Sequence, residues 1–119
     1  MPVKLFDSER KVMEPLWRSG DLPAGQIAKL LLEEIGWNRN TTYTVIKKCI
    51  EKGAIERREP GFVCHALIGR EEVQRQETDE LIDKMFGGSQ DAFFAAMLRP
   101  GRLSREEIDH LKKLVDELE

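Results

Sequence analysis

The chain has 119 residues, of which 40% are hydrophobic and 34% charged, and its net charge is −3. This length suits one domain, or one domain with a small appendage, and no apolar run reaches the roughly 18 residues of a membrane span. The N-terminus lacks the apolar stretch of a signal peptide, so we expect a cytoplasmic protein without membrane insertion. Two cysteines, Cys49 and Cys64, are too few for a disulfide scaffold.

The first third of the chain predicts two helices. Ser8 or Asp7 can cap the first, which has an apolar face and should kink at Pro15. Residues 19–23 predict a turn, and the proline that ends it suits the first position of a second helix running to about Ile35.

A third helix is predicted from an N-cap at Asn38 to Gly53. Apolar residues recur there at helical spacing, which separates a packed face from a polar one. The packed face comprises Thr42 (through its methyl group), Ile46, Cys49, Ile50 and Gly53, with Val45 at the boundary. The polar face comprises Asn40, Thr41, Tyr43, Thr44, Lys47, Lys48 and Glu51.

A β-hairpin follows the third helix. Residues 54–58 and 62–68 alternate like strands, and the turn at 59–61 contains Pro-Gly. Alternation places Phe62, Cys64, Ala66 and Ile68 on one side of the hairpin. Three helices followed by a two-stranded hairpin form a winged helix-turn-helix. The predicted fold class is therefore mainly α (α+β winged helix), with this domain at 1–69.

Residues 70–119 predict three more helices, at 70–86, 89–98 and 104–119, separated by glycine-containing breaks. A segment this small rarely buries such a large apolar set alone. We therefore expect a helical dimerisation region, in preference to docking within one chain. The residues predicted to form the dimer contact are Leu81, Met85, Phe86, Phe93, Phe94, Met97, Leu98, Ile108, Leu111 and Val115.

Positive charge is concentrated around the third helix. Residues 38–58 hold six basic residues against two acidic ones, whereas residues 69–119 hold eight against 13. A helix that enters the major groove of DNA needs short polar side chains near its N-terminus and cations for phosphates. We expect Lys52 to extend this basic strip. The residues predicted to contact DNA are Asn40, Thr41, Tyr43, Thr44, Lys47, Lys48, Arg57 and Arg58.

Other functions are less well supported by the residues. No nucleophile, base and orienting group can be assembled, since Cys64 and His65 are strand neighbours that point to opposite faces. We therefore expect no enzyme, no cofactor and no metal site. Two alternatives stay open: a winged helix that binds an acidic protein partner, and a metal- or redox-responsive repressor that uses Cys49 and Cys64.

Several motifs resemble a known family over nearly the whole chain. LFDSERKVMEPLW is similar to the family's opening segment, and the pattern W-x-x-x-T-x-x-T is matched by Trp37, Thr41 and Thr44, followed by Lys52-Gly53. The chain thus resembles the penicillinase and methicillin-resistance repressors (BlaI/MecI), a family that also includes CopY-type repressors. The resemblance implies a dimeric winged-helix repressor of resistance genes, and two-fold symmetry predicts a palindromic operator.

The sequence departs from the family pattern at three places. The wing's usual aromatic pair corresponds to Phe62 and Cys64, so the second aromatic is missing. The resemblance implies inactivation by a sensor-protease pathway at an Asn-Phe bond, where this chain has Ala96-Met97. The paired CxC motifs of the copper-responsive members do not occur.

Overall fold

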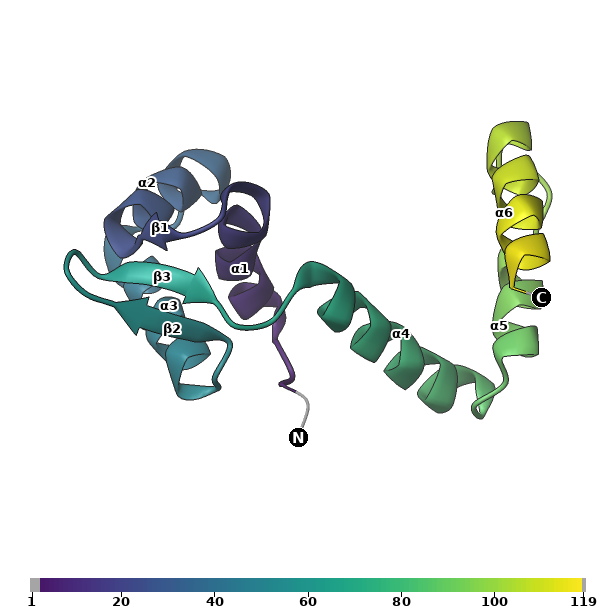
Figure 1. Cartoon of the computed structure of the whole chain (residues 1–119), viewed down its shortest axis with the longest axis horizontal. Helices are drawn as coiled ribbons and strands as arrows, with labels where there is room; N and C mark the ends of the chain where they lie inside the picture. The colour runs from purple at the N-terminus through teal and green to yellow at the C-terminus, as the bar shows by residue number, and fades with distance from the viewer. Residues whose placement is uncertain (1–2, 119) are drawn as a thin grey trace. The chain divides into compact units, whose positions relative to one another are not determined.

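A computed structural model describes residues 3–118 of the chain. The elements of this part follow in the order shown in Figure 1: α1 (Asp7–Ser19), β1 (Leu22–Pro23), α2 (Ala24–Ile35), α3 (Arg39–Glu51), β2 (Ile55–Arg58), β3 (Val63–Ala66), α4 (Arg70–Phe86), α5 (Gln90–Met97) and α6 (Arg105–Glu117). The predicted mainly helical class with a small sheet is confirmed.

The chain divides into two compact units, an N-terminal unit of Met1–Gln76 and a C-terminal unit of Glu77–Glu119. The division falls within α4, so this helix belongs in part to each unit.

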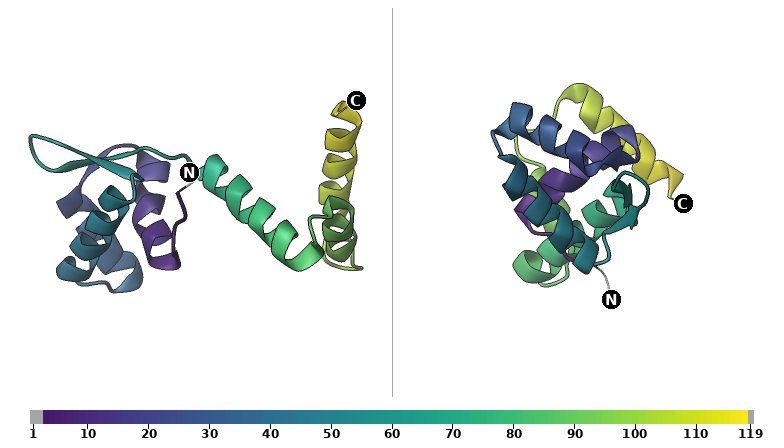
Figure 2. Two further views of the ribbon diagram at one scale, coloured as in Figure 1. Left: turned by 90° about the horizontal axis from the view of Figure 1, so that it is seen from below. Right: turned by 90° about the vertical axis from the view of Figure 1, so that its left-hand side faces the viewer.

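In the N-terminal unit, three helices and a small sheet enclose one core. Met13, Ile27, Ile46 and Ile55 are almost completely buried in it, one from each of α1, α2, α3 and β2. These side chains recur at helical or strand spacing in the sequence, so each amphipathic element turns its apolar face inward. The tip of the β2–β3 hairpin projects past the helices, as Figures 1 and 2 show.

The sheet has three strands rather than the two expected. β1 pairs antiparallel with β3 through Leu22 and Cys64, giving the order β1-β3-β2. The prediction of a simple turn at 19–23 was therefore incomplete. A two-residue strand is too short to show alternation. Its strand partner also lies about 40 residues later along the chain, so no local pattern predicts it.

The cap of α1 also differs from the prediction. The N-cap is Phe6, whose backbone N–H donates to Glu9 Oε1 at 2.7 Å, so neither Ser8 nor Asp7 has this role. Glu9 is only 1% exposed, and its position is fixed by further contacts described below. The helix continues through Pro15 to Ser19.

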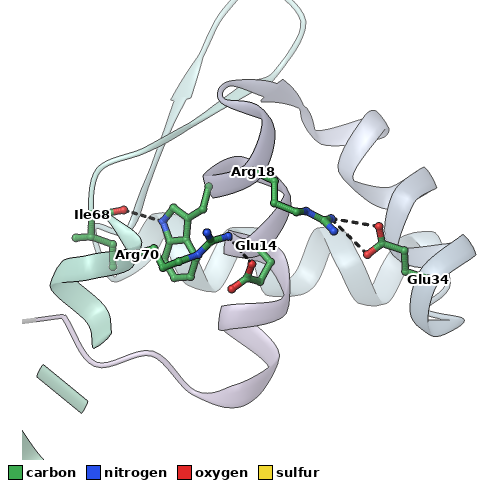
Figure 3. A network of polar contacts seen from close by, with 6 residues as sticks. Glu14, Arg18, Glu34, Ile68 and Arg70 are labelled. Carbon is green, nitrogen blue, oxygen red and sulfur yellow. Dashed lines mark hydrogen bonds and ion pairs between the residues drawn. The ribbon is translucent and has the colours of Figure 1, made fainter. Parts of the chain in front are cut away.

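Polar contacts join α1 to its neighbours (Figure 3). The indole Nε1–H of Trp17 donates to the carbonyl oxygen of Ile68 at 3.0 Å, and Arg70 pairs with Glu14 at 2.8 Å. Since Val73 is also buried, the first turn of α4 is anchored on the N-terminal unit.

The C-terminal unit has well-capped helices but little core. Ser89 caps α5, and Ser104 and Glu107 form the predicted capping box of α6. Among its described residues 77–118, Ile82 is the only hydrophobic side chain that is buried. An apolar groove of about 530 Å³ lies between α5 and α6.

Candidate nucleic-acid interface

The helix α3 has the two faces that the periodicity predicts. The side chain of Asn38 caps it by accepting a hydrogen bond from the backbone N–H of Thr41 at 2.8 Å. The buried face comprises Thr42, Val45, Ile46 and Cys49. The opposite face exposes Asn40, Thr44, Lys47 and Lys48, with Thr41 half-buried.

Two predictions for the packed face of α3 were wrong. Val45 is only 6% exposed and so belongs to the core rather than to the boundary. Gly53 is exposed and lies beyond the end of the helix, where φ is +82°. Glycine adopts this left-handed conformation without strain, which explains why it follows α3.

Tyr43 is less available than its place on the polar face suggests. Its half-buried ring packs edge-to-face against Phe62 of the hairpin, with the ring centroids 5.8 Å apart. Arg39, one helical turn earlier, donates from Nη2 to the Tyr43 hydroxyl at 3.0 Å. Sequence reasoning left Arg39 out of the site, although the i, i+4 spacing of an arginine and a tyrosine indicates such a contact.

The two hairpin arginines are exposed, and each is paired with a carboxylate. Arg57 Nε lies 2.6 Å from Glu59 Oε1, and Arg58 Nε lies 2.7 Å from Glu56 Oε1. Arg58 also lies 3.5 Å from Asp21. The hydrogen bonds from the guanidinium groups hold the pKa of Glu56 and of Glu59 below its ordinary value, so both stay ionised. A charge count along the sequence does not detect this pairing.

Lys52 does not extend the basic strip, so that expectation was wrong. Its Nζ lies 2.6 Å from Glu9 Oε1, donates to the carbonyl oxygen of Lys4 at 2.9 Å and sits 3.8 Å from the centre of the Phe6 ring. The lysine therefore neutralises a buried carboxylate and secures the start of α1. By contrast, within residues 3–118 neither Lys47 nor Lys48 has a carboxylate at ion-pair distance.

The two cysteines are both buried, and neither forms a disulfide within the described residues. Burial, with a smaller contribution from Glu9, raises the pKa of the Cys49 thiol to about 12. Burial likewise raises the pKa of Cys64 to about 11. Thiols of this kind are poor nucleophiles and poor metal ligands at neutral pH. Over the described range 3–118, no group of three His, Cys, Asp or Glu residues is placed to hold a metal ion.

Helices α2 and α3 with the β2–β3 hairpin define a winged helix-turn-helix, and the arrangement of an exposed polar α3 beside a basic hairpin is that of a DNA-binding domain. The Penicillinase repressor family model matches residues 5–117. The chain therefore belongs to the penicillinase repressor family. Within the described residues, every helix is too short or too polar to cross a membrane.

Relatives of known name support this assignment. The chain is 23% identical to the penicillinase repressor of Bacillus licheniformis over 96% of its own length and 91% of that protein. It is 21% identical to the methicillin resistance regulatory protein MecI of Staphylococcus aureus, over 95% and 94% of the two chains. The solution structure of the DNA-binding domain of the repressor BlaI aligns with a TM-score of 0.54 and 25% identity, covering 59% of this chain and 88% of that one. The chain is thus a repressor of the BlaI/MecI type with a DNA-binding domain, and not an enzyme.

Proposed function

We propose that the chain acts in the cytoplasm as a homodimeric repressor that binds a palindromic operator through α3. The observation that carries this proposal is the division of α3 into a buried face and an exposed face of short polar side chains. The buried face fixes the orientation of the helix, so the exposed face is presented to a partner in one geometry. The two unpaired lysines on that face suit a partner with regularly spaced negative charges.

The proposed roles of the individual residues follow from the length of their side chains and their positions on α3 and the hairpin. Asn40, Thr41 and Thr44 have short side chains near the start of α3, so they would approach base edges. Lys47 and Lys48 follow on the exposed face and would contact phosphates. Arg57 and Arg58 would contact the phosphates that flank the groove after exchanging their carboxylate partners for the DNA backbone.

The C-terminal unit supports the homodimer. Phe94, Leu98 and Val115 are 52%, 61% and 61% exposed, and all three line the groove between α5 and α6. Such a continuous apolar surface marks an interaction site. A second copy of the chain is the partner we propose, because a symmetric dimer would present two α3 helices to two half-sites of a palindrome.

The names of the relatives suggest the target. One is a penicillinase repressor and another is a methicillin resistance regulatory protein. We propose that this chain controls a resistance or stress gene, and that a sensor or protease pathway releases it. The family's Asn-Phe bond is replaced by Ala96-Met97 at the end of α5, so we do not expect release by cleavage at this bond.

Operator selection from random duplexes tests the proposal. We expect a palindrome to be enriched by the wild-type chain, and Thr41→Ala or Thr44→Ala to weaken binding by about 1–3 kcal/mol and relax the preference. Lys48→Ala is the matched control on the same helix, because it should weaken all sequences alike and lower the salt slope by about one. If both threonine variants kept the wild-type preference, α3 would not read the operator.

A further inference from the structure

Phe62 has a backbone conformation that does not suit its side chain. Its φ is +48°, and it is the only non-glycine residue with positive φ among those described. Glycine and asparagine occupy this left-handed region far more readily than a bulky residue does. The presence of a phenylalanine at this strained position indicates that its ring has a role that glycine could not fill.

The ring of Phe62 lies between the Arg57 guanidinium and Tyr43 of α3. The Arg57 guanidinium stacks on it, with its carbon 3.7 Å from the ring centroid. The edge-to-face contact with Tyr43 joins it to α3, and Arg39 stacks on Tyr43 at 4.8 Å. The side chains therefore form a continuous row of ring contacts from the hairpin to the first turn of α3, in the order Arg57, Phe62, Tyr43 and Arg39.

The backbone of Phe62 adds a third connection. Its carbonyl oxygen accepts a hydrogen bond from the N–H of Ala24 at 2.9 Å, at the first residue of α2. One residue thus touches the hairpin, α2 and α3, the three elements that a winged helix uses against DNA.

We propose that Phe62 is a positioning residue that holds the hairpin at a fixed place beside α3, so that Arg57 and Arg39 meet the DNA backbone together. The inference rests on the proposed binding of DNA by α3. Stacking restricts Arg57 to the ring face in the free protein, where, among residues 3–118, it bonds only to the exposed carboxylate of Glu59. A phosphate can replace that carboxylate while the guanidinium stays on the ring, which reduces the entropy lost on binding.

The same stack assigns Tyr43 a different role from the one expected from sequence. Its ring packs against Phe62 and its hydroxyl accepts a hydrogen bond from Arg39. Tyr43 therefore links the hairpin to Arg39 at the start of α3. Arg39 then becomes an additional phosphate contact, placed immediately before Asn40, the first of the residues proposed to read bases.

The test compares Phe62→Gly, Phe62→Leu and Phe62→Tyr with the wild-type chain on its selected operator over a range of salt concentrations. Glycine relieves the backbone strain but removes the ring, leucine keeps apolar bulk without a π face, and tyrosine preserves the stack. We expect Phe62→Gly and Phe62→Leu to weaken operator binding by roughly three- to tenfold and to lower the salt slope by about one. Phe62→Tyr should bind like the wild type.

A double-variant comparison separates positioning from simple packing. If Phe62 acts through Arg57, adding Phe62→Leu to Arg57→Ala should cost much less affinity than it costs in the wild type. Additive losses of affinity in the double variant would overturn the inference about Phe62 but not the proposed function. Wild-type affinity in both Phe62→Leu and Phe62→Gly would do the same. A wild-type chain that enriches no duplex would instead refute the proposed function, and the inference with it.

Discussion

Replacement of Leu98 by aspartate should prevent self-association if the groove between α5 and α6 is the dimer surface. Leu98 is 61% exposed, and complete burial of a leucine contributes about 1.5–3 kcal/mol. Covering its remaining surface would therefore contribute about 1–2 kcal/mol in each protomer. A symmetric dimer contains the residue twice, so the loss is about 2–4 kcal/mol, or roughly 30- to 1000-fold in the dimer dissociation constant.

The assay is a sedimentation or light-scattering measurement of mass over a series of protein concentrations. Leu67→Asp is the matched control, because Leu67 is a leucine of similar exposure, 49%, in the N-terminal unit. Circular dichroism should show the same helix content in both variants, since neither leucine is buried. A Leu98→Asp chain that associates as strongly as the Leu67→Asp control would refute the assignment of this surface, as would a wild-type chain that is monomeric at micromolar concentration.

Four further changes test the site and the core. Thr42→Val should raise the free energy of unfolding by about 1 kcal/mol, because the buried Thr42 hydroxyl oxygen has no hydrogen-bond partner among the described residues. Lys52→Met should lower it by about 3 kcal/mol, since buried Glu9 would lose its counter-ion. Glu59→Gln should tighten binding to non-specific DNA by about two- to fivefold at low salt, because it frees a hairpin guanidinium. Because burial raises the pKa of Cys49 from 9.0 to about 12, the folded chain keeps this proton after the unfolded chain loses it, and stability should fall as pH rises from about 9 to about 12.

Three of these changes have a control. Thr44→Val introduces the same valine on the exposed face of α3 and should leave stability unchanged in a urea titration. Adding Glu9→Gln to Lys52→Met should restore part of the lost stability, and a Lys52→Met chain as stable as the wild type would contradict the buried ion pair. For the pH series, Cys49→Ala should remove the part of the slope due to this thiol, so equal slopes in both chains would contradict the assignment.

The local elements of the N-terminal unit could be predicted because each depends on a pattern within one short segment. Ile46 and Cys49 recur at helical spacing, and Asn38 is a good N-cap, so the faces and the start of α3 could both be derived. The hairpin followed from a Pro-Gly turn between two alternating segments. These signals need no knowledge of what packs against them.

Several features that sequence reasoning missed depend on residues far apart in the chain. Lys52 looked like one more cation beside Lys48 until its partner, 43 residues earlier, was known. The cap of α1 was predicted at Ser8 or Asp7, whereas the N-cap is Phe6, whose backbone N–H donates to a Glu9 carboxylate that Lys52 holds in place. The strand β1 exists only because β3 lies beside it. Periodicity identifies the buried and exposed faces of a helix, but it does not identify the ion-pair partners of the charged residues on the exposed face.

The pairing of charges alters what the local excess of positive charge means for DNA binding. Arg57 and Arg58 are each offset by a neighbouring carboxylate and Lys52 is offset by Glu9, so Arg39, Lys47 and Lys48 are the main cations left for phosphates on each α3. Three phosphate contacts give a salt slope of only about three and weak non-specific binding. A single copy would therefore have little affinity for DNA of arbitrary sequence. Strong binding would require both copies of a dimer on correctly spaced half-sites, where the arginines could also exchange their carboxylates for phosphates. We therefore expect the dimer surface to control operator affinity more strongly than any single cation, and Leu98→Asp to weaken the operator complex more than Lys48→Ala.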